Sequence, residues 1–183
     1  MIASKTSIDL GSWDGWTKGP TMENVPGMQL MGYVSNPQSQ GSVHITTPDP
    51  EAPPQIRANY LTHDQDKARS IAMFRYMRQF LGQASLAGIV GEETIPGVEV
   101  ETDDQILEAF DTYSGPGYHA CGSAKMGTDN MAVVDPRLRV HGVSDLRVVD
   151  ISIFPSITSA NTNGPAMATA WRGADLIIED RKA

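Results

Sequence analysis

Cysteine is nearly absent from this chain of 183 residues, and acidic residues outnumber basic ones. The single cysteine, Cys121, excludes an intrachain disulfide and is compatible with a reducing compartment. Only 14 lysines and arginines face 22 acidic residues, which gives a formal net charge of -8 and a pI of about 4.8. Because the basic residues are few and scattered, we expect neither nucleic acid nor an anionic membrane as a partner.

Long hydrophobic runs are missing as well. No apolar stretch approaches the ~20 residues that a membrane-spanning helix needs. Residues 1–10 lack the apolar core of a secretory signal peptide. We therefore expect a cytoplasmic protein without a membrane span.

Residue spacings typical of metal sites are also lacking. Neither H-x3-H nor C-x2-C spacing occurs among the four histidines and the cysteine, so we expect no metal site. Cys121 lies two residues after His119, which raises the alternative of a Cys/His nucleophile. We reject it, because two residues within a turn arrange a thiol and an imidazole poorly for proton transfer, and no cysteine-hydrolase signature surrounds them.

The clearest pattern in the sequence is a helix near the C-terminus. Asn163 is a favoured N-cap residue, and Pro165 suits a first helical turn, where its missing N–H is no loss. The spacing predicts a helix from 163 to about 179 with one buried apolar face, formed by Met167, Ala170, Trp171, Ala174, Ile177 and Ile178. The free N–H groups at its start, beside Gly164, would suit an anionic ligand such as a reduced flavin ring.

A short buried strand is predicted just upstream, over residues 145–150, because Leu146, Val148 and Val149 are strand formers ahead of a turn-prone Asp150. A strand, a connection and an apolar-faced helix form the closing unit of a nucleotide-binding α/β sheet, in which ligands sit beyond the carboxyl ends of the strands. The same pattern also fits an ordinary strand and core helix without a ligand.

His119 is the candidate for proton transfer. It follows the Gly115-Pro116-Gly117 turn and precedes a stretch rich in Gly, Ser and Ala, so it does not belong to a periodic apolar face. Histidine suits proton transfer near neutrality, since its ordinary pKa is about 6.5. Without other evidence, a histidine in such a place is more often structural or solvated than catalytic.

The middle of the chain predicts an α+β arrangement. Residues 43–46 and 56–60 read as an antiparallel pair joined by a proline-rich loop. Two capping boxes, starting at Thr62 and Thr102, predict helices that end near Gly82 and Gly115. Residues 1–19, with Trp13 and Trp16 as packing groups, read as irregular or as an edge hairpin. A domain boundary is expected near residue 116.

Several segments together closely resemble the C-terminal part of the glucose-methanol-choline (GMC) family of flavoprotein oxidoreductases. The resemblance is highly specific from 118 to 178 and looser upstream. It rests on residues 118–127, 134–142, 146–150, 161–165 and 171–177, and upstream on 32–34, 39–45, 49–50 and 56–61.

This resemblance implies a mixed α+β and α/β fold. Residues 1–115 would form part of an antiparallel-sheet substrate-binding domain with helices. Residues 116–183 would supply the active-site crossing and the closing strand and helix of a Rossmann-like FAD-binding domain. The family's G-x-G-x-x-G turn for the FAD pyrophosphate does not occur in this sequence. We therefore expect a C-terminal portion, whether a separate subunit, a cleaved chain or a shortened one, that needs an N-terminal FAD-binding partner.

The resemblance also implies FAD-dependent oxidation of a small alcohol, with His119 as the general base and Asn163 as the group that holds the substrate oxygen. Residues matching the family's cofactor contacts are Asp150, Ile151, Asn163, Gly164 and Pro165. Tyr118 is expected to contact substrate. Two alternatives stay open: a flavin-containing hydroxynitrile lyase, and a non-catalytic fragment that completes another chain.

Overall fold

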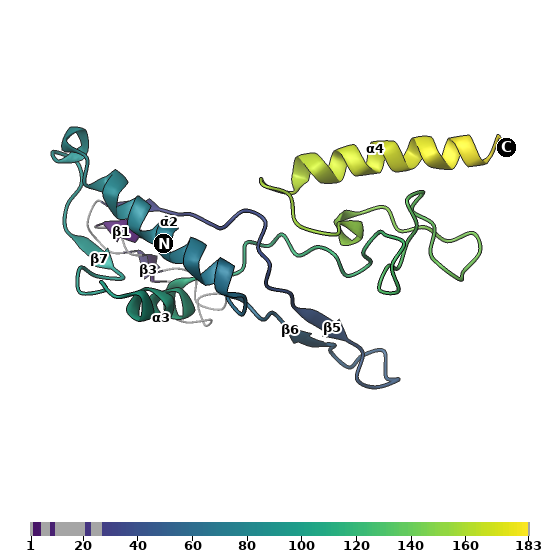
Figure 1. Ribbon diagram of the computed structural model, residues 1–183, viewed down its shortest axis with the longest axis horizontal. Helices are drawn as coiled ribbons and strands as arrows, with labels where there is room; N and C mark the ends of the chain where they lie inside the picture. The colour runs from purple at the N-terminus through teal and green to yellow at the C-terminus, as the bar shows by residue number, and fades with distance from the viewer. Residues whose placement is uncertain (1, 5–7, 10–20, 23–26, 183) are drawn as a thin grey trace. The chain divides into compact units, whose positions relative to one another are not determined.

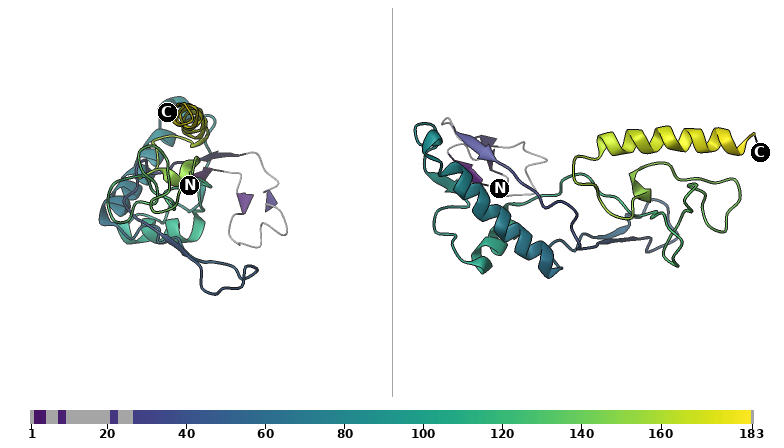
Figure 2. Two further views of the ribbon diagram at one scale, coloured as in Figure 1. Left: turned by 90° about the vertical axis from the view of Figure 1, so that its right-hand side faces the viewer. Right: turned by 45° about the horizontal axis from the view of Figure 1, so that its top comes forward.

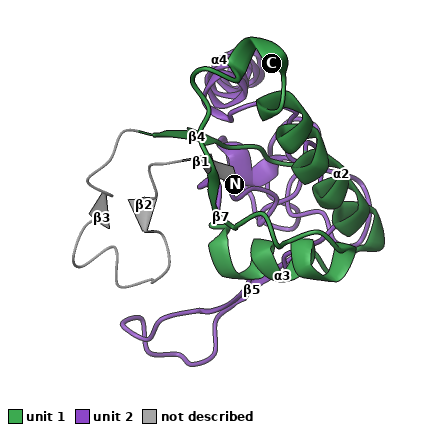
Figure 3. Ribbon diagram, turned by 90° about the vertical axis from the view of Figure 1, so that its left-hand side faces the viewer, with its two compact units in different colours: residues 1–34, 61–115 green, residues 35–60, 116–183 purple. Residues whose placement is uncertain are grey.

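A computed structural model describes residues 2–4, 8–9, 21–22 and 27–182 (Figure 1). The chain divides into two compact units, drawn in different colours in Figure 3. Unit 1 comprises Met1–Val34 and Leu61–Gly115, and unit 2 comprises Ser35–Tyr60 and Pro116–Ala183. The chain passes from one unit to the other between Gly115 and Pro116, while residues 35–60 cluster with the C-terminal segment. The roles assigned to 1–115 and 116–183 stay predictions.

Unit 1 contains an antiparallel sheet of three short strands in the order β4-β1-β7. These are β1 (Ile2–Ser4), β4 (Met28–Leu30) and β7 (Glu93–Ile95). A separate pair joins β2 (Ile8–Asp9) to β3 (Thr21–Met22). Trp13 and Trp16, expected to be packing groups, lie outside the described residues.

The two helices of unit 1, α2 (Asp64–Leu81) and α3 (Asp103–Tyr113), occur where the sequence predicts them. In α3 the capping box is complete, because the Thr102 side chain accepts from the Gln105 amide and the Gln105 side chain accepts from the Thr102 amide. In α2 the N-cap is His63 and not Thr62, since His63 Nδ1 accepts from the Gln65 amide at 3.2 Å. A short 3-10 helix, η1 (Ala84–Leu86), follows α2.

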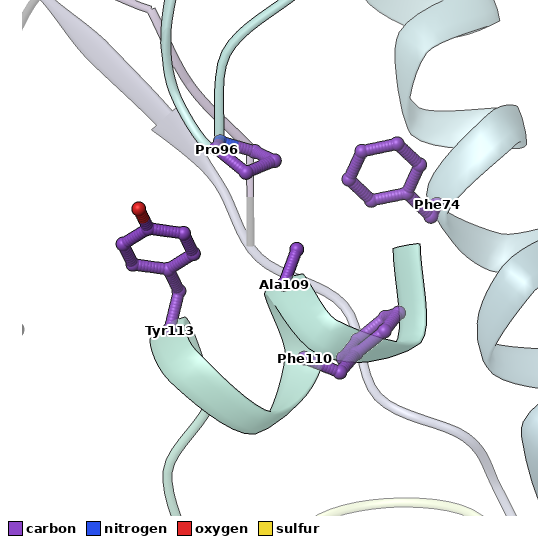
Figure 4. Close-up of a pocket in the computed structure, with 5 residues that line it drawn as sticks. All are labelled: Phe74, Pro96, Ala109, Phe110 and Tyr113. Carbon is purple, nitrogen blue, oxygen red and sulfur yellow. The ribbon is translucent and has the colours of Figure 1, made fainter. Parts of the chain in front are cut away.

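Aromatic and aliphatic side chains of α2 and α3 fill the interior of unit 1. Its buried core residues are Phe74, Met77, Leu81 and Ile106. The rings of Phe74 and Phe110 meet edge to face, 6.4 Å apart. Figure 4 shows the small cavity beside them, lined by Phe74, Pro96, Ala109, Phe110 and Tyr113. At about 10 Å³ it has room for roughly one water molecule, so it cannot hold a substrate.

Unit 2 combines a hairpin, a 3-10 helix and a long α-helix. The hairpin pairs β5 (Ser42–His44) antiparallel with β6 (Gln55–Arg57), which confirms the predicted pair and its proline-rich loop. η2 (Ile151–Ile153) precedes α4 (Asn163–Asp180), which runs without interruption in the right-hand view of Figure 2. A second core holds these elements together through Val134, Leu138, Ile153 and Leu176.

The strand predicted over residues 145–150 does not form as a ladder. This segment makes only an isolated bridge, Arg139 to Arg147, with two flanking backbone hydrogen bonds from Val140 to Leu146 and from Val148 to Leu138. Leu146 is half exposed. A strand needs a neighbour along its length, and among the described residues only the short segment around 138–140 runs beside it.

The prediction of which face of α4 is buried was wrong. Met167, Ala170, Trp171, Ala174 and Ile178 are exposed, while Gly173 and Leu176 are buried against the core of unit 2. The helix is apolar on two sides, so its periodicity alone could not decide which side packs. The close approach of Val149 and Leu138 to Gly173 decides it. Met167, Trp171 and Ile178 then form an exposed apolar stripe, called here the α4 stripe.

Replacing Gly173 by alanine is expected to destabilise unit 2. A Cβ at this position would overlap a methyl group of Val149 and lie 3.3 Å from Leu138 Cδ1. Overpacking of this kind costs about 1–3 kcal/mol, whereas alanine in place of glycine adds about 1 kcal/mol of helix propensity. We expect a net loss of up to about 2 kcal/mol in thermal or urea unfolding.

Gly164→Ala is the matched control, because Gly164 lies in the same helix with no atom near the added Cβ. We expect it to leave the free energy of unfolding unchanged or slightly raised. Equal effects of the two substitutions would contradict the packing of α4 through Gly173.

An arginine cluster fixes the C-terminal end of α4. Arg137, Arg139 and Arg147 all donate to the carboxylate of Asp180, and Arg137 also pairs with Glu179 at 3.1 Å. These hydrogen bonds, the one from Arg139 first, hold the pKa of Asp180 well below its usual range. The cluster joins the 137–147 segment to the last turn of the helix.

The stabilisation from Asp180 is expected to depend on pH. A carboxylate whose pKa is depressed by folding contributes stability above the ordinary Asp pKa of about 4, and loses that contribution as the pH falls below it. Asp180→Asn should therefore lower the unfolding temperature at pH 7. The difference from wild type should shrink as the pH is lowered to about 2.

Asp175→Asn serves as the comparison, because Asp175 is an exposed residue of the same helix with no ion pair among the described residues. It should change the unfolding temperature little at any pH. A pH-independent effect of Asp180→Asn would argue against the ionic role.

Candidate active site

His119 lies immediately after the point at which the chain enters unit 2. Tyr118 precedes it with φ +56°, a left-handed conformation that is uncommon for a non-glycine residue. Such a backbone costs on the order of 1–3 kcal/mol and persists only where the surroundings impose it. His119 is partly buried and Tyr118 is 70% exposed, so the site is open on the Tyr118 side.

Backbone hydrogen bonds to η2 hold the segment that follows His119. The Ala124 amide donates to Ser152 O at 2.9 Å, and the Met126 amide donates to Ile153 O at 2.8 Å. Gly122 permits this approach, because its φ is +85° and an added Cβ would lie 3.2 Å from Phe154 O. Through these contacts η2 fixes the loop that carries His119.

Both ring nitrogens of His119 have partners in the loop that leads into α4. Nε2 lies 3.2 Å from Asn161 Oδ1, and Nδ1 lies 3.1 Å from the Thr162 hydroxyl. With the proton of the neutral ring on Nε2, Nδ1 accepts from that hydroxyl. Asn161 is exposed, whereas Thr162 is 5% exposed. The Nε2 side of the ring is therefore the side that an incoming molecule can reach.

The expected N-cap Asn163 is corrected to Thr162. The Thr162 carbonyl accepts the first helical hydrogen bond, from Ala166 at 2.8 Å, so Asn163 is the first residue of α4. Thr162 does not cap with its side chain. Two residues after Asn163 comes Pro165, which has no N–H to offer a cap, and the Thr162 hydroxyl contacts His119 instead. Within the described residues, Asn163 shares no hydrogen bond with His119.

The structure thus brings His119 together with Asn161 and Thr162, two residues that the sequence reasoning did not select. The Asn161-Thr162-Asn163 run contains two asparagines of equal chemistry. A shift of one residue in the helix start decides which of them faces the histidine. The sequence could have offered Asn161 as an equal candidate, but it could not rank the two.

The residues expected to contact the cofactor lie at two chain turns of unit 2. Asp150 caps η2 by accepting from the Ser152 amide at 2.7 Å, and Ile151 is the first residue of η2. Hydrogen bonds from the Ser152 side chain and backbone hold the pKa of Asp150 below its usual range, so it stays ionised. Asn163 and Gly164 are exposed at the start of α4, and Pro165 is partly buried.

The thiol of Cys121 lies two residues after His119 in the sequence. Burial raises the pKa of the Cys121 thiol, which disfavours the nucleophilic thiolate. No group of three or more His, Cys, Asp and Glu side chains that could hold a metal occurs in the part of the chain that the structure describes. No helix among those residues is long and apolar enough to span a membrane.

Comparison with known proteins decides the family. The family model described as GMC oxidoreductase matches residues 37–170. The chain belongs to the GMC oxidoreductase family. This confirms the resemblance stated from the sequence, and the mixed α/β fold with a small antiparallel sheet agrees with it.

Relatives of this GMC chain include two bacterial choline dehydrogenases. An oxygen-dependent choline dehydrogenase of Rhizobium rhizogenes (strain K84 / ATCC BAA-868) is 44% identical over 77% of this chain and 26% of its own length. That of Brucella ovis (strain ATCC 25840 / 63/290 / NCTC 10512) is 41% identical over the same shares. The chain thus spans about a quarter of the length of these relatives.

Three solved structures also resemble this GMC chain over about a quarter of their own length. An FAD-dependent oxidoreductase from Chaetomium thermophilum is 30% identical with a TM-score of 0.76, covering 81% of this chain and 26% of that one. A fungal aryl-alcohol oxidase is 31% identical with a TM-score of 0.74, covering 81% of this chain and 25% of that one. A pyridoxine 4-oxidase from Mesorbium loti is 28% identical, with a TM-score of 0.73 over 85% of this chain and 29% of that one.

Proposed function

We propose that this chain contributes the proton-accepting site of an enzyme that oxidises a small alcohol with FAD. The observation that carries the proposal is the position of His119, held between Asn161 and Thr162 at the start of α4. The family membership and the relatives, which act as choline dehydrogenases and an aryl-alcohol oxidase, support this reaction class. A location in the cytoplasm stays a prediction.

The start of α4 fits the electron-rich edge of a flavin ring. Asn163 and Gly164 are exposed there, and no atom lies within 4 Å of the position of an added Cβ on Gly164, so backbone amides can approach a ligand closely. The positive end of the helix dipole favours negative charge at this point. Together with Asp150 and Ile151, these residues would hold the ring, and FAD when bound would accept a hydride.

His119 would take the hydroxyl proton of the alcohol at Nε2, since that nitrogen lies beside exposed Asn161 and not beside buried Thr162. A carbinol carbon can lose a hydride only if its hydroxyl proton also leaves, so a base within hydrogen-bond reach is required. The amide of Asn161 presents either Oδ1 or Nδ2 after a half-turn of its terminal bond. With Nδ2 forward, it would donate to the substrate oxygen as negative charge develops there.

The geometry therefore favours Asn161 over Asn163 as the residue that holds the substrate oxygen. Asn163 keeps its proposed contact with the cofactor, because it is exposed at the start of the helix. Tyr118, 70% exposed and adjacent to His119, keeps its proposed contact with substrate.

We further propose that an FAD-binding part, on the N-terminal side or in a separate subunit, completes the site. Met167, Trp171 and Ile178 of the α4 stripe are 67%, 77% and 51% exposed, which is unusual for large apolar side chains spaced along one helix face. The relatives are almost four times as long as their match to this chain. A partner covering the stripe would also bring the phosphate-binding residues that this sequence lacks.

The test is anaerobic mixing of the flavin-loaded protein, meaning this chain assembled with its FAD-binding part, with alcohols such as choline and an aryl alcohol. Bleaching of the oxidised flavin absorbance, with formation of the aldehyde, would support the proposal. Cyanide release from a cyanohydrin without bleaching would support the hydroxynitrile lyase. A native preparation without flavin or either activity would favour the non-catalytic alternative.

A further inference from the structure

We propose that Thr162 is a positioning residue for His119, because its hydroxyl can accept a hydrogen bond from Nδ1–H and so stabilise the form of the ring whose Nε2 accepts the substrate proton. This inference rests on the proposed function and adds a residue to its machinery. It starts from the hydroxyl of Thr162, which lies 3.1 Å from His119 Nδ1.

The Thr162 hydroxyl is buried, and His119 Nδ1 is its hydrogen-bond partner. Thr162 is 5% exposed and is one of three buried polar residues among those described, with Asp66 and Ser70. A buried hydroxyl needs a hydrogen bond, and the helix cap that threonine often provides is not made here. Because threonine is β-branched, its χ1 angle is restricted and the hydroxyl is held in place. The pair is therefore a fixed contact rather than a passing one.

The hydroxyl suits both proton states of the ring. With the proton of the neutral ring on Nε2, Nε2–H donates to Asn161 Oδ1 and the Thr162 hydroxyl donates to Nδ1. To act as a base, the neutral ring must carry its proton on Nδ1, and the same hydroxyl then accepts from Nδ1–H. When Nε2 has taken the substrate proton, both nitrogens are donors, and Thr162 continues to accept. No rearrangement of the backbone is needed for this exchange.

An apolar side chain at position 162 would favour the wrong form of the ring. Valine has nearly the shape of threonine but cannot accept from Nδ1–H. In its presence, the neutral ring would keep its proton on Nε2, where Asn161 Oδ1 accepts it, and the imidazolium would have an unsatisfied donor. Hydrogen bonds to charged groups contribute enough that their loss slows such a step by about 10- to 100-fold.

The experiment compares Thr162→Val with Thr162→Ser in the flavin-loaded protein. We expect valine to slow anaerobic flavin reduction by about 10- to 100-fold and serine, which keeps the hydroxyl, to restore the rate to within a few fold of wild type. Flavin content should be equal in both. Thr169→Val, the same exchange further along α4, is the control and should leave the rate unchanged.

A second measurement reads the proton position directly. In protein labelled with [15N]histidine and held at a pH where the ring is neutral, the 15N shifts distinguish Nδ1–H from Nε2–H. The His119 signals are those that vanish in His119→Ala. Thr162→Val should increase the Nε2–H share relative to wild type, whereas Thr162→Ser should not.

The outcomes separate this inference from the proposed function. If His119→Ala abolishes reduction while Thr162→Val leaves both rate and 15N shifts unchanged, Thr162 has only a structural role and the inference is overturned. If His119→Ala itself leaves the rate unchanged, the proposed function fails first. If valine and serine slow the reaction equally, the hydroxyl is not the cause, and this also overturns the inference.

Discussion

Replacing His119 with alanine is expected to slow anaerobic flavin reduction by alcohol about 10²–10⁴-fold, the usual cost of losing a positioned general base. Alanine removes both ring nitrogens, so neither the substrate proton nor the contacts with Asn161 and Thr162 can be held. The base is needed because hydride leaves the carbinol carbon only as its hydroxyl proton departs. Stopped-flow absorbance of the flavin measures the effect.

Flavin content should remain near wild type in this variant, since His119 is not among the residues proposed to hold the ring. His44→Ala is the matched control, because His44 is an exposed histidine of β5 in the same unit. It should reduce its flavin at the wild-type rate. An unchanged rate in His119→Ala would remove His119 from the mechanism altogether.

Asn161→Ala is expected to lower the rate of flavin reduction by about 10²–10³-fold, as the loss of one preorganised donor to a developing oxyanion typically does. Asn161 contacts Nε2, the ring nitrogen that a substrate can reach, so its amide is placed to hold the same oxygen from which the proton leaves. Asn163→Ala is the direct comparison, because the resemblance to the family assigned this role to Asn163. We expect a much smaller effect on the reduction rate at equal flavin occupancy.

The order of the two effects tests the geometry of the helix start. Asn163→Ala could instead lower flavin affinity, which absorbance at equilibrium would reveal separately from the rate. If Asn163→Ala slowed reduction as strongly as predicted for Asn161→Ala, and Asn161→Ala did not, the original assignment from the sequence would stand. Asn161→Asp extends the test, since it keeps an acceptor for Nε2–H but places a negative charge beside the developing alkoxide, and it should be at least as slow as alanine.

The sequence by itself determined the features that depend on residues close to one another in the chain. The Thr102 to Gln105 capping box starts α3 as predicted, since its hydrogen bonds join residues three apart. The hairpin of β5 and β6 follows from alternating residues on either side of a proline-rich loop. The sequence also identified the GMC family, because its motifs recur in order over residues 118–178, whereas the catalytic role of His119 stays a prediction.

Tertiary structure alone decided which face of each element is buried and which distant residues it contacts. The periodicity of α4 fits burial on either of two sides, and only the contact of Gly173 with Val149 and Leu138 selects one. Residues 145–150 have strand-forming side chains, but a ladder depends on a neighbouring segment that the local pattern does not supply. Which asparagine lies beside His119 depends on where the first helical hydrogen bond begins. The Thr162 carbonyl accepts that bond, and the Thr162 hydroxyl contacts His119, which lies 43 residues away in the sequence. No short-range pattern encodes such a contact.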